Sequence, residues 1–215
     1  MQIDVMKIIR NILVVFLIIN AAILITGFLL PSGYTVSRET TINRSRSEIF
    51  EYIKLLKNQH EYSVWWKMDP NQITTYTGED GQVGFSAAWK SELESVGAGE
   101  EEIIGIQENE RMDFEVRFHE PFESKAISAM ELTALDSLST QVRWTFNGDM
   151  TYPFNAVLLF MSMDKILGED LQSGLNNLKS ILESQPPTSM KQLPDWQWSN
   201  EGWRWTQVRP KGEGC

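Results

Sequence analysis

The stretch between Tyr152 and Glu183 most constrains what this chain can fold into. After Pro153 it contains no further proline, and its apolar residues recur at steps of three, four or seven, the spacing of one helix face. These apolar residues are Phe160, Leu167, Leu171, Leu175, Leu178 and Leu182. An unbroken helix of this length would reach about 45 Å, at about 1.5 Å per residue. Such a stripe needs a broad apolar partner, so we expect a long helix lying across a curved sheet.

Two glycines interrupt the apolar stripe. Gly168 and Gly174 each lower helix propensity by about 1 kcal/mol relative to alanine, and they indicate either close approach of a neighbouring backbone or a local break. Asp164 lies on the same helix face, one turn before Gly168. Its carboxylate is expected either to meet solvent at a kink or to point into a cavity.

Seven segments upstream of this helix have the character of strands. They are residues 34–42, 73–77, 83–91, 100–107, 111–119, 125–135 and 140–147. Met112, Phe114 and Val116 share one face of the fifth segment, and Trp89 and Trp144 lie on the apolar faces of the third and seventh. One apolar and one charged face are typical of an antiparallel sheet that is covered on one side. Short turns separate the segments, so we expect a meander.

A short helix is expected after the first strand. Ser45 and Glu48 have the spacing of a capping box, in which each side chain bonds a backbone N–H at the helix start. The apolar residues Ile49 and Phe50 follow directly. Residues 55–70, which include Trp65, are aromatic and irregular in pattern, so no regular element is predicted there.

Residues 12–30 are almost wholly apolar and match the ~20 residues needed to cross the hydrocarbon core of a bilayer as a helix. The alternative is a cleaved signal peptide, whose apolar region is only about 7–15 residues long and precedes a small-residue cleavage site. This run is longer and residues 27–30 offer no such site, so we expect a retained anchor. Lys7 and Arg10 precede the run and favour a cytoplasmic N-terminus, with the domain outside the cytoplasmic membrane.

Composition and motifs exclude several classes of function. The formal net charge of −10 argues against nucleic acid as a partner, because phosphate binding relies on basic patches. The single cysteine, Cys215, permits no intramolecular disulfide and no cysteine-based metal site. The sequence contains no nucleotide-binding, metalloprotease or serine-hydrolase motif, so we expect neither a metal nor a cofactor.

The composition changes again after residue 184. Pro186 and Pro187 indicate a linker, and a tryptophan-rich tail follows. Its indoles either pack back on the domain or offer an interface to a protein partner or a membrane. The expected organisation is therefore an anchor at 1–30, a domain at 31–184 and a Pro/Trp-rich tail at 185–215.

Several short motifs occur in an order known from one protein family. They include Tyr62-Ser63-Val64-Trp65, Gly97-Ala98-Gly99, Thr140-Gln141-Val142-Arg143-Trp144 and Met163-Asp164-Lys165. With them, residues 34–183 resemble the bacterial polyketide cyclase-like members of the SRPBCC (START/Bet v 1) superfamily. Many members have Trp-Ser-Pro-Trp where this chain has Tyr62 to Trp65, which puts the local aromatic pocket in doubt.

The resemblance implies an α+β helix-grip fold, in which a strongly bent antiparallel sheet grips the C-terminal helix around a cavity. Relatives bind lipids, sterols, polyketides or other apolar molecules. The expected function is therefore a membrane-anchored domain that binds a lipid or another apolar small molecule. The residues expected to line the cavity are Trp65, Trp89, Phe114, Trp144, Asp164, Gly168 and Leu171.

Two alternatives stay open, because a fold does not fix a function. The first is an enzyme of the cyclase or aromatase type, for which Asp164, His60 and Arg117 are the candidate acid and base groups. The second is a protein-interaction module resembling the chaperone-activating relatives, with the tail as its binding surface. The acidic run 100–102 is interpreted as solvated charge. Convergent polar groups in the cavity would favour the enzyme.

Overall fold

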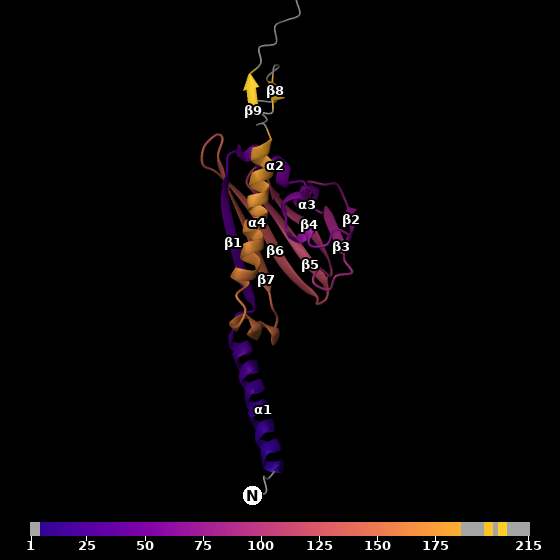
Figure 1. Ribbon diagram of the computed structural model, residues 1–215, viewed down its shortest axis with the longest axis vertical. Coiled ribbons are helices and arrows are strands. Elements are labelled where there is room, and N and C mark those ends of the chain that lie inside the picture. The colour runs from indigo at the N-terminus through magenta and orange to yellow at the C-terminus, as the bar shows by residue number, and fades with distance from the viewer. Residues whose placement is uncertain (1–4, 186–195, 200–201, 206–215) are drawn as a thin grey trace, which may run out of the picture.

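Alternating apolar and polar residues form seven antiparallel strands in the computed structural model, which describes residues 5–185, 196–199 and 202–205. In the order in which they lie side by side, the strands are β1 (Gly33–Ile42), β7 (Thr140–Asp149), β6 (Ser124–Ala134), β5 (Arg111–Glu120), β4 (Ala98–Gln107), β3 (Ser86–Lys90) and β2 (Ile73–Thr77). Strands β2 to β7 form the predicted meander, and β1 pairs with the last of them. Figure 1 shows the sheet bent around the long helix α4.

The helices lie before, between and after the strands. They are α1 (Val5–Leu29), α2 (Arg46–Ile53), α3 (Gln59–Tyr62) and α4 (Met163–Ser184), with the 3-10 helices η1 (Leu56–Asn58), η2 (Trp65–Lys67) and η3 (Phe154–Leu159). The predicted α+β helix-grip fold is confirmed. The capping prediction also holds, because the Ser45 hydroxyl accepts a hydrogen bond from the Glu48 backbone N–H at the start of α2.

The long helix begins later than the apolar spacing predicted. Residues 154–159 form η3, and α4 starts only at Met163. Ser162 has an extended backbone, and its hydroxyl accepts a hydrogen bond from the Lys165 N–H, which begins a new helix there. Phe160 therefore lies outside the stripe and is 83% exposed, whereas the stripe from Leu171 to Leu182 is buried against the sheet.

Helix α1 extends away from the end of the sheet at which β1 begins and β7 ends (Figure 1). Residues Met6–Leu29 are long and apolar enough to span a membrane, and their side chains are almost all exposed. Asn155 of η3 joins α1 to the domain, since its Nδ2 donates to the carbonyls of Gly27 (2.6 Å) and Leu30 (3.2 Å). Helix α1 is thus connected to the domain by hydrogen bonds of one side chain as well as by the chain.

The tail contains two further strands, β8 (Trp196–Ser199) and β9 (Gly202–Trp205), which form a separate antiparallel pair. The side chains of this pair and the rest of residues 186–215 lie outside the described part of the chain. The expected role of the tail tryptophans therefore stays a prediction.

Candidate functional site

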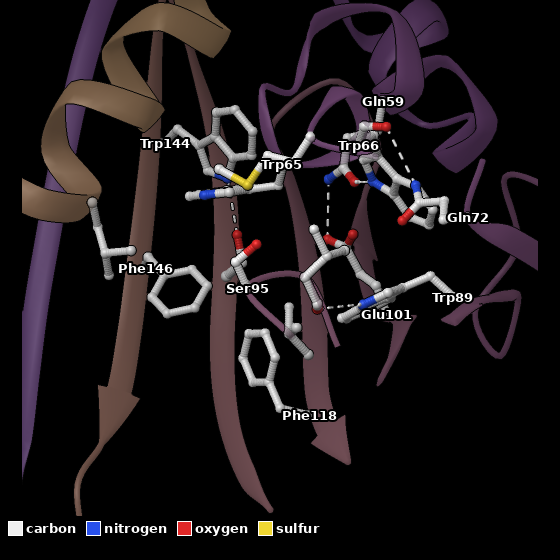
Figure 2. A pocket seen from close by; sticks show the side chains of 15 residues that line it. Gln59, Trp65, Trp66, Gln72, Trp89, Ser95, Glu101, Phe118, Trp144 and Phe146 are labelled. Atoms are coloured by element: carbon white, nitrogen blue, oxygen red, sulfur yellow. Dashed lines mark hydrogen bonds between the residues drawn. The ribbon is translucent and has the colours of Figure 1, made fainter. Parts of the chain in front are cut away.

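A pocket of about 210 Å³ lies between the sheet, the α3–η2 segment and α4 (Figure 2). The sheet contributes Val116, Phe118 and Phe146, among others, and Leu167 of α4 closes one side. Most of the lining is apolar, as is usual for pockets that bind small molecules. The pocket is where a ligand of this fold would be held between sheet and helix.

Aromatic pairs form two walls of this pocket. On the α4 side the Trp65 ring lies 5.7 Å from Trp144 and 6.1 Å from Phe146, centroid to centroid. On the opposite side the Trp89 ring lies 5.9 Å from both Trp66 and Phe118. Edge-to-face pairs at these distances stabilise the rings beyond their burial. The walls are therefore held in place by contacts within the protein.

The indole N–H groups of the lining all donate to protein acceptors. Trp65 donates to Asp170 and Trp144 to Ser128 Oγ. Trp66 and Trp89 donate to Gln59 Oε1 and to the Val96 carbonyl, the bonds drawn in Figure 2 with that of Trp144. Since these donors are already bonded, the indoles present ring faces and edges to a ligand.

Glu101 of β4 is the charged residue of the lining, and it was not among the residues predicted for the cavity. Its side chain is 7% exposed, and Gln59 Nε2 donates to its Oε1 at 3.0 Å. Burial raises the pKa of the Glu101 carboxyl to about 7. The interpretation of residues 100–102 as solvated charge is thus wrong for the middle one. Alternation with Ile103, which is fully buried on the same face, was the available signal.

Three of the predicted cavity residues, Trp65, Trp89 and Trp144, line the pocket. Phe114 and Leu171 are fully buried in the adjoining core and are not among the lining residues. Both occupy the predicted apolar faces, but neighbouring side chains cover them. An apolar face in the sequence does not distinguish a core position from a pocket position.

Asp164 and Gly168 lie outside the pocket, against β1. The Arg38 guanidinium donates to the Asp164 carboxylate at 2.8 Å and to the Asp164 carbonyl at 3.0 Å, and the aspartate side chain is 64% exposed. A Cβ atom on Gly168 would lie 2.0 Å from Arg38 Nη2. The space left by this glycine is therefore filled by Arg38, whereas the sequence analysis placed Gly168 in the cavity lining.

The other acid and base candidates from the sequence also fall outside the lining. His60 stacks on Trp66 with ring centroids 3.9 Å apart, and burial lowers the pKa of its imidazole. Arg117 bonds to Glu100, Glu102 and Glu115. These contacts give both residues structural partners and leave Glu101 as the titratable group in the lining.

The pocket lies toward the end of the sheet that carries α1. At this end of the sheet β1 begins and β7 ends, and Gly33 pairs with Asp149. Trp89, Phe118 and Phe146 lie near the ends of β3, β5 and β7 at the same end of the sheet. Apolar side chains are exposed at the same end. They are Leu93 (48%), Phe122 (81%), Phe154 (67%) and Phe160 (83%). The ligand-sized space and an exposed apolar surface thus share one end of the domain.

The chain was compared with protein families, with curated proteins and with solved structures. A family model described as polyketide cyclase / dehydrase and lipid transport matches residues 34–183. Comparison with curated proteins gave no match. Among solved structures, norcoclaurine synthase from Thalictrum flavum, in complex with dopamine and hydroxybenzaldehyde, has a TM-score of 0.56 at 9% identity, covering 73% of this chain and 90% of that one.

Two bacterial structures agree with that assignment. Proteins from Chromobacterium violaceum and Rhizobium loti each have a TM-score of 0.50, at 12% and 17% identity. Each match covers 69% of this chain and 96% of the other. At these identities the likeness shows the fold alone, whereas the family model covers more than half of the sequence. The protein therefore belongs to the polyketide cyclase-like family of the SRPBCC (START/Bet v 1) superfamily.

Proposed function

We propose that this protein is a membrane-anchored domain that binds a lipid or another apolar small molecule in the pocket between the sheet and α4. The observation that carries the proposal is an aromatic-walled pocket at the end of the sheet that bears a long apolar helix. The family description, which names lipid transport beside cyclase chemistry, is consistent with such a ligand.

Helix α1 supports the membrane part of the proposal. Its 24-residue apolar segment, Met6–Leu29, is about 36 Å long at about 1.5 Å per residue, enough for a hydrocarbon core of about 30 Å. In water this surface would remain exposed, because the described domain covers very little of it. Lys7 and Arg10 near its start favour a cytoplasmic N-terminus, which puts the domain outside the cytoplasmic membrane.

The exposed apolar residues at the anchored end support delivery of the ligand from the bilayer. Phe122, Phe154 and Phe160 lie at the end of the domain from which α1 leaves, as Leu93 does. Phenylalanine and leucine side chains on the apolar side of a membrane-bound surface enter the boundary between headgroups and acyl chains. An apolar ligand would then pass from lipid to pocket with little exposure to water.

The size of the pocket restricts the ligand. Its volume of about 210 Å³ lies below the ~300–1,000 Å³ of most small-molecule sites, so it suits a ring system or the end of a chain. Burial of each methylene contributes about 0.8 kcal/mol before the loss of translational freedom on binding. A long acyl chain would extend through the mouth toward the membrane.

The two alternatives have less support. An enzyme of the cyclase type would need an acid or base in the pocket, and Asp164, His60 and Arg117 are not among the lining residues. Glu101 remains for that role, and it is considered below as a ligand contact. The interaction module depends on the tail, whose side chains lie outside the described residues.

Native mass spectrometry of the full-length chain, purified in detergent from a bacterial membrane, tests the proposal. Val116→Phe adds bulk inside the pocket, whereas Ile127→Phe adds a ring at a partly exposed position of β6 that does not line it. We expect an apolar molecule bound to the wild type and to Ile127→Phe, and its loss from Val116→Phe. A wild type that retains no molecule and takes up no added apolar ligand would refute the binding function.

A further inference from the structure

Among the polar groups that line the pocket, the carboxylate of Glu101 is charged and buried and has an oxygen left for a ligand. Glu101 is more than nine-tenths buried, and its one recorded hydrogen bond comes from Gln59 Nε2 to Oε1. Gln59 is itself oriented by Trp66, whose indole N–H donates to Gln59 Oε1 at 2.7 Å. The other carboxylate oxygen has no recorded partner among the described residues.

No cation compensates the Glu101 carboxylate in the described part of the chain. Arg117 follows Val116, the residue that pairs with Glu101 on the adjoining strand, but it bonds to three other carboxylates, Glu100, Glu102 and Glu115. Opposite Glu101 the neighbouring strands present Ala87 and Val116. A buried carboxyl without a counter-charge is unfavourable unless a partner satisfies it.

We propose that Glu101 binds a hydrogen-bond donor on the ligand, so that the pocket selects apolar molecules that carry an amino or hydroxyl group and rejects carboxylates. This inference rests on the proposed function and specifies its ligand class. The indole donors of the lining are already bonded within the protein, and the Glu101 carboxyl is the charged group of the lining that keeps a free oxygen. A ligand ammonium would also supply the missing positive charge.

The surroundings of Glu101 are suited to this role. Burial raises its pKa to about 7, so near neutral pH a large share of the carboxyl is ionised and accepts hydrogen bonds, and a bound ammonium would favour this form further. Tyr62, which packs behind it from α3, has a pKa raised well above its usual value by burial and stays neutral. His60 lies against Trp66 rather than in the lining, and Gln59 is uncharged. A bound ammonium would therefore meet one titratable partner.

Calorimetric titration of the full-length protein in nanodiscs, with empty nanodiscs subtracted, tests the inference. The probes share one naphthalene body: 2-naphthylmethylamine, 2-naphthylmethanol, 2-methylnaphthalene and 2-naphthoate. We expect the amine and the alcohol to bind more tightly than methylnaphthalene, and naphthoate to bind worst. Glu101→Leu should lower amine affinity about tenfold to hundredfold, the range for a hydrogen bond to a charged group, without weakening methylnaphthalene.

Two further variants separate the chemistry from the fold. Glu101→Gln keeps an acceptor without charge, so alcohol binding should persist while amine binding falls. Glu102→Gln changes the next residue, which bonds Arg117 outside the lining, and should bind every probe as the wild type does. Equal affinities of the wild type for amine, alcohol and methylnaphthalene would overturn the inference and leave the binding function intact. Failure of every probe, including methylnaphthalene, would overturn both.

Discussion

The two ends of the space between the sheet and α4 are both lined by apolar residues, but one end is filled by side chains and the other contains a pocket. At the end near α2, Phe50 and Ile53 are buried in the same core cluster as Leu178 and Leu182 of α4. At the end near α1, aromatic rings meet edge to face around a pocket. The difference teaches that closure of this fold depends on a covering helix. Where α2 supplies one, its apolar side chains are buried, as expected of a close-packed protein interior.

The first prediction compares one phenylalanine at each end. Phe50→Ala removes a fully buried ring from the closed end and should lower the free energy of unfolding by about 3–5 kcal/mol. Phe118→Ala removes a ring that already borders the pocket and is partly exposed, so we expect less than half of that loss. Urea titration of the full chain in mild detergent, followed by near-ultraviolet circular dichroism, measures both. Equal losses would show that the two ends are packed alike.

The second prediction uses the buried carboxyl of the open end. The pKa of Glu101 is 4.5 in the unfolded chain and about 7 in the folded chain. Between these two pH values the folded state therefore binds more protons at Glu101 than the unfolded state does. Stability is therefore lost as the pH rises through this window, by about 3 kcal/mol in total. Glu101→Gln should be more stable than the ligand-free wild type by up to about 3 kcal/mol at pH 8, and by under about 1 kcal/mol at pH 5.

Urea titrations of both proteins at the two pH values measure this difference. Glu102→Gln serves as the control, because its carboxylate bonds Arg117 and should not give a stabilisation that grows with pH. A constant difference between Glu101→Gln and the wild type from pH 5 to pH 8 would contradict the prediction.

The third prediction concerns the glycines of α4. Gly168→Leu should displace Arg38 and lower stability by about 1–3 kcal/mol, the range for overpacking, while ligand uptake stays unchanged. Gly174→Ala serves as the comparison on the same helix, because the new Cβ would lie 2.7 Å from the ring of Trp144, a residue that lines the pocket. That variant should alter uptake. Fluorescence titration with an apolar dye measures both, and loss of uptake in Gly168→Leu would extend the pocket to Arg38.

Local sequence patterns predicted the strands well, because alternation over ten residues reports directly which face is buried. The segment predicted at 73–77 coincides with β2, and the other boundaries shift by a few residues at most. The start of α4 was mispredicted, because one serine cap at residue 162 outweighs an apolar spacing that includes Phe160. Periodicity shows the face of a helix and says little of where it begins.

The site was predicted only in part, because residues that are far apart in the sequence fill the same space. Trp65, Trp89 and Trp144 follow from their faces, whereas the residue that fills the space at Gly168 comes from β1, far upstream. Glu101 shows the opposite failure. Its place on the same face as Ile103 was readable from alternation, but a glutamate next to two others is usually solvated, and that expectation outweighed the alternation.

The connection between α1 and the sheet limits how far the domain can travel. Helix α1 ends at Leu29 and β1 begins at Gly33, so three residues join them and extend over at most about 10 Å. Asn155 shortens even this reach by bonding the carbonyls of Gly27 and Leu30. In the proposed membrane protein, the domain therefore stays on the bilayer that holds its own helix. Under that proposal the domain would exchange ligand with this one membrane, and a ligand destined for a second membrane would need a separate carrier.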